Sequence, residues 1–126
     1  MRTALVVDDS AVIRKVARRI LETLDFKVSD AEDGEKALAQ CAHAMPDVIL
    51  LDWNMPNMDG YAFLQALRGS YEGLAPKVLF CTAENEVGAI ARALRGGADE
   101  YIMKPFDRDI LTAKLEQVGF HQGAGG

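Results

Sequence analysis

Four short runs of consecutive apolar residues recur along the chain, and they constrain its fold more than any other feature. Continuous runs of this kind, rather than alternating ones, are typical of strands buried on both faces of a parallel sheet. A further segment, residues 27–31, alternates instead, which predicts a half-exposed strand nearer the sheet edge. The four runs cover residues 4–7, 48–51, 78–81 and 101–103.

Segments with helical periodicity separate these runs. Ser10 and Asp107 precede two of the segments in the position of N-caps, and Gly96-Gly97 ends another. The apolar stripe predicted for the first helix consists of Val12, Ile13, Val16, Ile20 and Leu24. Strands that alternate with helices imply parallel pairing through right-handed crossovers. We therefore expect an α/β fold with a single doubly wound five-stranded parallel sheet flanked by five helices.

Length, composition and charge exclude several classes of protein. The chain has 126 residues, of which 49% are hydrophobic and 26% are charged, ordinary values for one globular domain. Its net charge of −5 opposes binding to the nucleic-acid backbone. The apolar runs are far shorter than the ~18 residues of a membrane span, and the first ends too early for a secretory signal. We expect a cytoplasmic monomer that neither binds nucleic acid nor inserts into a membrane.

The domain is expected to cover residues 1–118. Residues 119–126 are Gly-rich and predict a short C-terminal tail, with no length left for an attached output domain. Cys41 and Cys81 lie in apolar periodic segments, which predicts buried free thiols rather than a zinc site. His43 and His121 have no acid or thiol nearby in the sequence and are expected to be surface or capping residues.

Each strand that is predicted to be buried is followed by a polar residue. Asp8 and Asp9 follow the first run, and Asp52 follows the second. Thr82 and Lys104 follow the last two. In an open parallel sheet the carboxyl ends of the strands lie along one edge, where ligands bind. These five side chains are therefore predicted to converge on one crevice.

The composition of this crevice points to phosphoryl chemistry. Two carboxylates ~4 Å apart repel by about 4 kcal/mol at an effective dielectric constant of about 20, so three of them need protons or a cation. All-oxygen ligands suit Mg²⁺ better than zinc or copper. The metal, the Thr82 hydroxyl and the Lys104 ammonium would together meet the needs of a phosphoryl group. Asp52 stands alone at a strand end and is interpreted as the nucleophile, whereas Asp8 and Asp9 would hold the metal.

These residues resemble the receiver domain of bacterial two-component response regulators, in its stand-alone CheY-like form, over roughly residues 3–118. The resemblance implies a flavodoxin-like strand order of 2-1-3-4-5 and a cis peptide bond between Lys104 and Pro105. The matching motifs are Val6-Val7-Asp8-Asp9-Ser10, Asp52-Trp53-Asn54-Met55-Pro56-Asn57-Met58-Asp59-Gly60, Thr82-Ala83-Glu84 and Lys104-Pro105-Phe106.

The resemblance also implies roles for the acidic residues. Asp52 would accept a phosphoryl group from a phosphohistidine on a sensor histidine kinase or a histidine phosphotransfer protein. Asp9, Asp52 and the main-chain carbonyl of Asn54 would ligate Mg²⁺. Asp8 would act on the metal mainly through water.

The remaining site residues have implied roles in the switch and in the lifetime of the signal. Thr82 and Lys104 would contact the phosphoryl oxygens. When Thr82 moves toward the phosphoryl group, Tyr101 would swing inward and reshape the face formed by the fourth helix, fifth strand and fifth helix. Asn54 and Glu84 would flank the attacking water and tune the lifetime of the phosphate.

The implied output is a signalling switch rather than an enzyme, one that catalyses its own phosphorylation and autodephosphorylation. Its switched face would bind a downstream protein target, in chemotaxis or motility or in other signalling. Alternatively, the chain would be a phosphorelay intermediate that passes phosphate to a histidine phosphotransfer protein. Two rival classes fit the sequence less well. A flavin-binding electron carrier needs a phosphate-holding loop where Asp8-Asp9 lies, and a metal-dependent phosphatase needs a substrate-enclosing cap.

Two groups of basic residues have open interpretations. Arg92 and Arg95 lie near the end of the predicted fourth helix, where they suit the helix macrodipole better than an anion site. A cluster on the first helix is either a solvated face or a docking surface for an acidic kinase surface. The cluster consists of Arg14, Lys15, Arg18 and Arg19.

Overall fold

The predicted strands form one parallel sheet. The computed structural model describes residues 2–70, 72–83 and 87–121. The strands are β1 (Arg2–Val7), β2 (Phe26–Ala31), β3 (Val48–Asp52), β4 (Lys77–Thr82) and β5 (Glu100–Met103). They are hydrogen-bonded in the order β2-β1-β3-β4-β5, and every neighbouring pair is parallel. The predicted fold and strand order are therefore confirmed.

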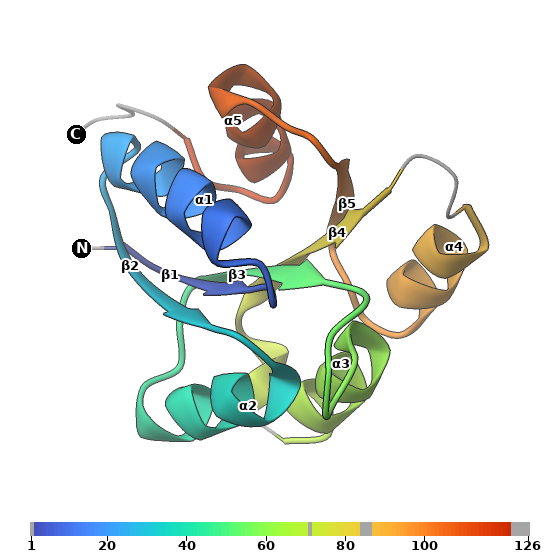
Figure 1. The fold of residues 1–126 in the computed structure, drawn as a ribbon. Coiled ribbons are helices and arrows are strands. Elements are labelled where there is room, and N and C mark those ends of the chain that lie inside the picture. The colour runs from blue at the N-terminus through green and yellow to red at the C-terminus, as the bar shows by residue number, and fades with distance from the viewer. Residues whose placement is uncertain (1, 71, 84–86, 122–126) are drawn as a thin grey trace.

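Helices cover both faces of this sheet, as predicted. They are α1 (Ala11–Thr23), α2 (Gly34–His43), α3 (Gly60–Arg68), α4 (Val87–Arg95) and α5 (Arg108–Gln117), with a short 3₁₀ turn, η1 (Glu72–Leu74), before β4. α1 and α5 lie over one face, and α2, α3 and α4 lie over the other (Figure 1). Each face encloses a hydrophobic core of its own. In the part of the chain that the structure describes, no helix is long and apolar enough to cross a membrane.

The buried face of α1 differs from the predicted stripe. Ala17 and Leu21 are fully buried against the sheet, but Val12 is 70% exposed and Val16 is 44% exposed. The helical repeat places residues 17, 21 and 24 in one buried row, and Ile20 beside this row is partly buried against the same core. The prediction that Val12 and Val16 belong to the buried face was therefore wrong, because two apolar rows lie side by side on the helix.

Helices begin at the edge of the sheet where strands end. The side chains of Ser10, Asp33, Asp59 and Asp107 each accept a hydrogen bond from a main-chain N–H in the first turn of the helix that follows. The two caps predicted from the sequence, Ser10 and Asp107, are therefore confirmed. The predicted cis peptide bond between Lys104 and Pro105 is also present near this edge.

The two cysteines are buried and free, as predicted. Burial raises the pKa of the Cys41 thiol to about 11 and that of Cys81 to about 12, so both stay protonated at neutral pH. His43 and His121 are exposed, also as predicted.

The C-terminal segment packs beyond α5. Phe120 packs against Phe26 with ring centroids 5.6 Å apart, two residues past the boundary expected at residue 118. The rest of the expected tail, residues 122–126, lies outside the described residues.

Candidate functional site

Three carboxylates meet at the carboxyl edge of the sheet. β1 leads directly into Asp8 and Asp9, and β3 ends on Asp52. Carboxylate oxygens of the three residues lie within 4.8 Å of one another. Asp8 and Asp52 are buried, whereas Asp9 is exposed. The structure therefore brings together the three acids that were expected to converge.

The ammonium group of Lys104 joins two of these carboxylates. Lys104 follows β5, and its Nζ donates hydrogen bonds to Asp8 Oδ2 at 2.8 Å and to Asp52 Oδ1 at 2.9 Å. Burial by itself lowers the pKa of Lys104, but the hydrogen bonds to Asp8 and Asp52 outweigh that effect. The pKa therefore lies above its ordinary value, and Lys104 is a cation at neutral pH.

The charge on Asp52 is only partly compensated. Burial raises the pKa of Asp52, and the negative charge on Asp8 raises it further. The hydrogen bond from Lys104 lowers the pKa but does not outweigh these effects, so the pKa lies above its ordinary value. Three carboxylates that face one ammonium leave an excess of negative charge, which a divalent cation would balance. The available donors are oxygen atoms, so the residues fit Mg²⁺.

Thr82 lies on β4, which pairs with the strand of Asp52, and Tyr101 lies on β5, on the far side of β4. Thr82 is the buried last residue of β4, and its carbonyl accepts a hydrogen bond from the N–H of Lys104 at 2.8 Å. Because β4 pairs with β3, Thr82 and Asp52 end neighbouring strands. Tyr101 is half-buried on β5, with the Nζ of Lys114 4.1 Å from its ring centroid. The predicted switch residues therefore occupy adjacent strands.

The loop after Asp52 makes a close return to the end of β3. The N–H of Gly60 donates to the carbonyl of Trp53 at 2.9 Å, and a Cβ at Gly60 would come within 2.3 Å of the Asp52 carbonyl oxygen. Glycine is therefore required at this position. Asn54 lies in the loop with an exposed side chain. Glu84, the other residue predicted to tune the phosphate lifetime, lies outside the described residues.

Sequence reasoning missed one buried acid. Among the described residues, the buried polar side chains are those of Asp8, Asp33, Asp52 and Thr82, and all but Asp33 were predicted as site residues. Asp33 caps α2 and accepts a hydrogen bond from Asn57 in the loop between β3 and α3. The Asp33-Gly34 pair before a helical segment was a signal for the cap. No sequence signal points to the contact with Asn57.

The basic cluster of α1 divides into two pairs. Arg14 and Arg18 turn toward β2, with Nε of Arg14 3.3 Å from Asp30 Oδ2 and Nη2 of Arg18 3.6 Å from Asp30 Oδ1. Arg14 also donates to the carbonyl of Asp8 at 2.8 Å, which anchors the start of the loop after β1. The pair therefore has a structural role. The exposed members of the cluster are Lys15 and Arg19.

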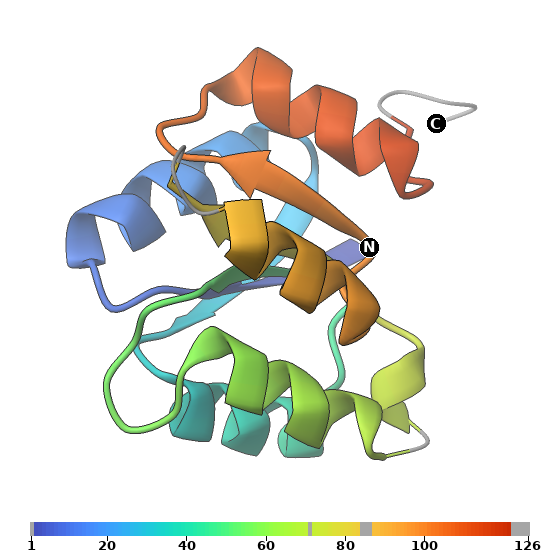
Figure 2. The ribbon, with the colours of Figure 1, turned by 90° about the vertical axis from the view of Figure 1, so that its right-hand side faces the viewer.

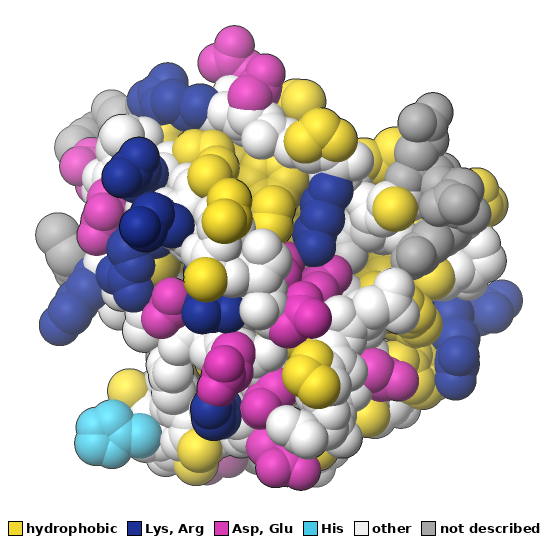
Figure 3. All heavy atoms as spheres, in the orientation of Figure 1, with side chains coloured by type: hydrophobic (Ala, Val, Ile, Leu, Met, Phe, Trp, Pro, Cys, Tyr) yellow, Lys and Arg dark blue, Asp and Glu magenta, His cyan; other side chains and the backbone are white. Residues whose placement is uncertain are grey.

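The acidic site is bordered by apolar surface. Figure 3 shows acidic side chains gathered near the middle of one face of the molecule, with hydrophobic side chains beside them over α1 and α5. Exposed apolar residues of these two helices are Val12, Val16 and Ile110.

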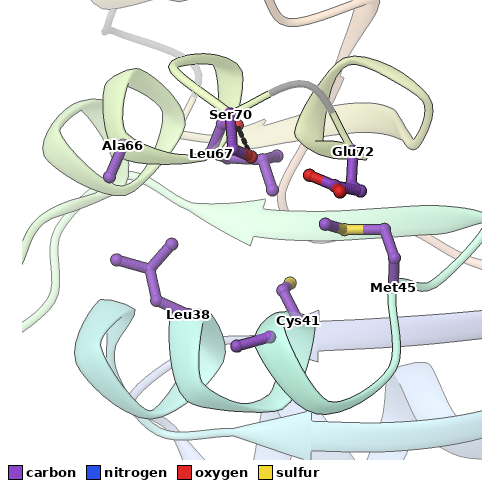
Figure 4. Close-up of a pocket in the computed structure, with 8 residues that line it drawn as sticks. Leu38, Cys41, Met45, Ala66, Leu67, Ser70 and Glu72 are labelled. Atoms are coloured by element: carbon purple, nitrogen blue, oxygen red, sulfur yellow. Dashed lines mark hydrogen bonds between the residues drawn. The ribbon is translucent and has the colours of Figure 1, made fainter.

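A cavity lies away from the acidic cluster, between α2 and α3. It has a volume of about 540 Å³, and apolar side chains make up most of its lining (Figure 4). Among the lining residues, Glu72 carries a carboxylate and lies beside Met45. The lining contains none of the residues predicted to carry chemistry, so the candidate site is the acidic cluster.

Comparison with known proteins identifies the family. The family described as the response regulator receiver domain matches residues 4–116, which is nearly the whole chain. The chain therefore belongs to this family, whose members are signalling switches of two-component systems rather than conventional enzymes.

Two curated relatives have similar sequences over the length of this chain. The phosphate regulon transcriptional regulatory protein PhoB of Escherichia coli (strain K12) is 38% identical over 117 residues, covering 93% of this chain and 51% of that protein. The probable transcriptional regulator ycf27 of Guillardia theta is 38% identical over 114 residues, covering 90% and 44%. The chain thus spans about half the length of these relatives.

Two solved structures are similar over nearly their whole length. The chemotaxis response regulator CheY4 of Vibrio cholerae superposes with a TM-score of 0.88 at 34% identity, covering 94% of this chain and 98% of that chain. The receiver domain of the sensor histidine kinase PA1611 of Pseudomonas aeruginosa PAO1 has a TM-score of 0.84 at 28% identity, covering 92% and 95%. That structure has a magnesium ion coordinated in its active site cleft.

Proposed function

We propose that the chain is a Mg²⁺-dependent switch in which Asp52 accepts a phosphoryl group from a phosphohistidine. The observation that carries this proposal is the ammonium of Lys104, which bridges Asp8 and Asp52 beside the third carboxylate of Asp9. Receiver domains interact with histidine kinases or phosphotransfer proteins, so the proposed donor is a protein of this kind. The PA1611 receiver domain, with its coordinated magnesium ion, supports the choice of metal.

The proposed reaction is an exchange of a P–N bond for an O–P bond. A carboxylate oxygen of Asp52 attacks the phosphorus atom as the bond to the imidazole nitrogen breaks, and the nitrogen leaves with the electron pair. The fixed ammonium of Lys104 orients Asp52 and offers positive charge to the phosphoryl oxygens. The Thr82 hydroxyl is the proposed donor to another of these oxygens.

The proposed magnesium ligands are Asp9, Asp52 and the main-chain carbonyl of Asn54. Asp8, held by Lys104, would act through water. When bound, the ion neutralises negative charge on the phosphoryl oxygens. Asn54 and Glu84 are proposed to flank the water that later hydrolyses the acyl phosphate and so to tune its lifetime.

The proposed output surface is formed by α4, β5 and α5, which lie side by side in Figure 2. Thr82 turns toward the phosphoryl group, and Tyr101 on the next strand moves inward, which changes this surface for a downstream protein target. Lys114 of α5 lies over the Tyr101 ring and pairs with Glu100 at 3.5 Å. A movement of Tyr101 would therefore disturb contacts between β5 and α5.

The apolar surface beside the acidic site supports a donor protein in which the phosphohistidine lies on a helix. Val12 and Val16 lie exposed on α1, and Ile110 is exposed near the start of α5. Exposed apolar side chains are typical of interaction surfaces, and an amphipathic helix can bury its apolar face against them. A helix that carries the phosphohistidine would contact this surface while it presents the phosphoryl group to Asp52.

Phosphoramidate, which contains the same kind of P–N bond as phosphohistidine, tests the acceptor without the natural partner. With Mg²⁺, the wild-type chain is expected to gain one phosphoryl group by intact-mass spectrometry, and Asp52→Asn is expected to gain none. A gain of equal size in the variant would show that the acceptor is misassigned.

Ring-proton NMR of Tyr101 tests the switch separately. Beryllofluoride, a phosphoryl analogue, is expected to change the environment of Tyr101 in the wild type. Thr82→Ala and Lys104→Ala are expected to weaken that response while they retain some phosphoryl chemistry. An unchanged Tyr101 signal in the wild type would refute the proposed switch.

A further inference from the structure

We propose that the first turn of α2 sets the affinity for Mg²⁺ by positioning the loop between β3 and α3 through the contact of Asp33 with Asn57. The inference rests on the proposed function, because it concerns the same metal site. Asn57 lies three residues after Asn54, whose carbonyl is a proposed ligand. Asp33 and Asn57 would be positioning residues that act through the loop rather than on the ion.

The loop touches α2 at two points. Nδ2 of Asn57 donates a hydrogen bond to Oδ2 of Asp33 at 3.0 Å. One residue further along each segment, Met58 lies directly against Gly34, where an added Cβ would come within 2.9 Å of Met58 Cγ and of the Met58 carbonyl oxygen. A side-chain hydrogen bond and a close approach of the backbone therefore join the loop to the helix.

Asp33 is a well-anchored acceptor. Its side chain is buried, and its Oδ1 accepts a hydrogen bond from the N–H of Lys36 at 2.9 Å while Oδ2 faces Asn57. The Lys36 N–H and the Asn57 amide stabilise the carboxylate, so the pKa of Asp33 lies below its ordinary value. A charged acceptor with both oxygens engaged holds its partner more strongly than a neutral one.

The main-chain conformation at Asn57 would suit glycine better than asparagine. Its φ of 67° lies in the left-handed region, where glycine fits with the least strain and asparagine is tolerated. The side chain of Asn57 provides what glycine cannot, namely the donor to Asp33. The hydrogen bond therefore accounts for asparagine at this position.

The loop is also attached at its two ends and through the side chains of Met55 and Met58, which pack against the core. The N–H of Gly60 holds the carbonyl of Trp53, and Asp59 caps α3. Loss of the contact at Asn57 would remove the side-chain hydrogen bond that joins this loop, which carries Asn54, to α2. Groups that orient metal ligands from outside the coordination sphere commonly change metal affinity by about tenfold or more.

Asn57→Gly tests the inference, because it removes the amide and keeps a residue suited to the same φ. Calorimetric titration of the full chain with MgCl₂ is expected to show a Kd about tenfold higher than in the wild type. The matched control is Asp25→Gly, which changes a residue with the same φ of 67° in the turn between α1 and β2. That control is expected to leave the Kd unchanged.

An exchange of the two side chains separates positioning from general stability. Asn57→Asp alone places two carboxylates in contact and is expected to weaken Mg²⁺ binding. The double variant Asp33→Asn with Asn57→Asp keeps a side-chain acceptor for the cap and restores the hydrogen bond with its polarity reversed. Its Kd is expected to return to within about threefold of the wild-type value, and unfolding midpoints measured in EDTA report the change in stability separately.

The outcomes distinguish this inference from the proposed function. Asn57→Gly with a wild-type Kd would overturn the positioning role and leave the phosphoryl switch intact. A folded double variant that stays as weak as Asn57→Asp would also overturn it. A wild-type chain that binds no Mg²⁺ would overturn both the inference and the proposed metal site.

Discussion

At the scale of single residues, Asp52 combines a reactive position with an unfavourable environment for its charge. Burial and the charge on Asp8 raise its pKa despite the hydrogen bond from Lys104. A carboxyl group with a raised pKa binds its proton more tightly in the folded chain than in the unfolded chain. Its contribution to stability is therefore lost as pH rises from the ordinary value near 3.8 through the raised pKa. Above that window, the charge of Asp52 destabilises the fold.

Asp52→Asn is therefore expected to stabilise the metal-free protein at neutral pH. The gain is expected to be about 1 kcal/mol, or a Tm increase of roughly 4 °C, and to shrink as pH falls through the raised pKa of Asp52 toward the ordinary value near 3.8. Calorimetric unfolding in EDTA, from neutral pH down to the ordinary pKa of aspartate, measures this difference in stability between the variant and the wild type. The exposed Asp25→Asn serves as a control that should show little change. A variant less stable than the wild type at neutral pH would mean that Lys104 fully compensates Asp52.

Two glycines make a matched pair for testing how tightly the site is packed. Gly60→Ala places a Cβ against the carbonyl of Asp52, whereas a Cβ at Gly88 in α4 would meet nothing within 4 Å. We expect Gly60→Ala to lower the free energy of unfolding by about 3 kcal/mol and Gly88→Ala to raise it by about 0.5–1 kcal/mol. Urea unfolding measures both. Similar effects of the two substitutions would contradict the close packing at Gly60.

At the scale of the elements, Arg68 joins the end of α3 to three other segments. Its Nη1 donates to the carbonyls of Gly73 and Pro76, each at 2.8 Å. Its Nε and Nη2 donate to the carbonyl of Gly97 at 3.0 and 2.9 Å, and Nη2 also reaches Asp99 Oδ2 at 2.9 Å. One half-buried side chain thus connects η1, the start of β4 and the turn before β5, at the edge of the sheet opposite the site.

Arg68→Met is expected to destabilise the chain by about 3 kcal/mol, because it leaves several carbonyl groups without their donor. The measurement is chemical unfolding with a matched control, Arg19→Met, on the exposed part of α1. Mg²⁺ binding is expected to persist in the Arg68 variant, since the network lies far from the acidic cluster. Equal stability of the two variants would show that solvent replaces the donor without cost.

Features set by local sequence were the ones that could be predicted. Each continuous apolar run became a strand, and Ser10 and Asp107 became caps, because these depend on neighbouring residues. Contacts between distant segments were predictable only where the parallel sheet brings strand ends to one edge, as it does for Asp8, Asp9 and Asp52. Arg92 lies in the last turn of α4, as expected, but its guanidinium also lies 4.2 Å from the ring centroid of Tyr61 in α3. Likewise, hydrophobicity could not show that Val12 faces solvent, since core and interaction surfaces use the same side chains.

At the scale of the whole molecule, the site gathers strands that belong to both cores. Asp8 and Asp52 extend from β1 and β3 in the middle of the sheet, and Lys104 extends from β5 at its edge. The two hydrophobic cores lie on opposite faces of these strands. A ligand held by several strand ends binds only the folded arrangement, so its binding free energy adds to the stability of the domain.

Mg²⁺ and then beryllofluoride are therefore expected to raise the Tm in two steps. A ligand present at about 100 times its Kd adds about 2.7 kcal/mol, which for a chain of this size is a Tm increase of roughly 10 °C. In Asp52→Asn the beryllofluoride step is expected to disappear, because the analogue has lost the carboxylate that holds it. Differential scanning calorimetry measures both steps.

Hydrogen exchange shows whether the stabilisation reaches both cores. Because β1, β3 and β5 each contribute a side chain to the cluster, amides on these strands are expected to gain protection together when beryllofluoride binds. Protection confined to β3 and its following loop would mean that the ligand stabilises one segment only. In that case phosphorylation would have no path through the sheet to α4, β5 and α5, and the proposed output surface would have to lie elsewhere.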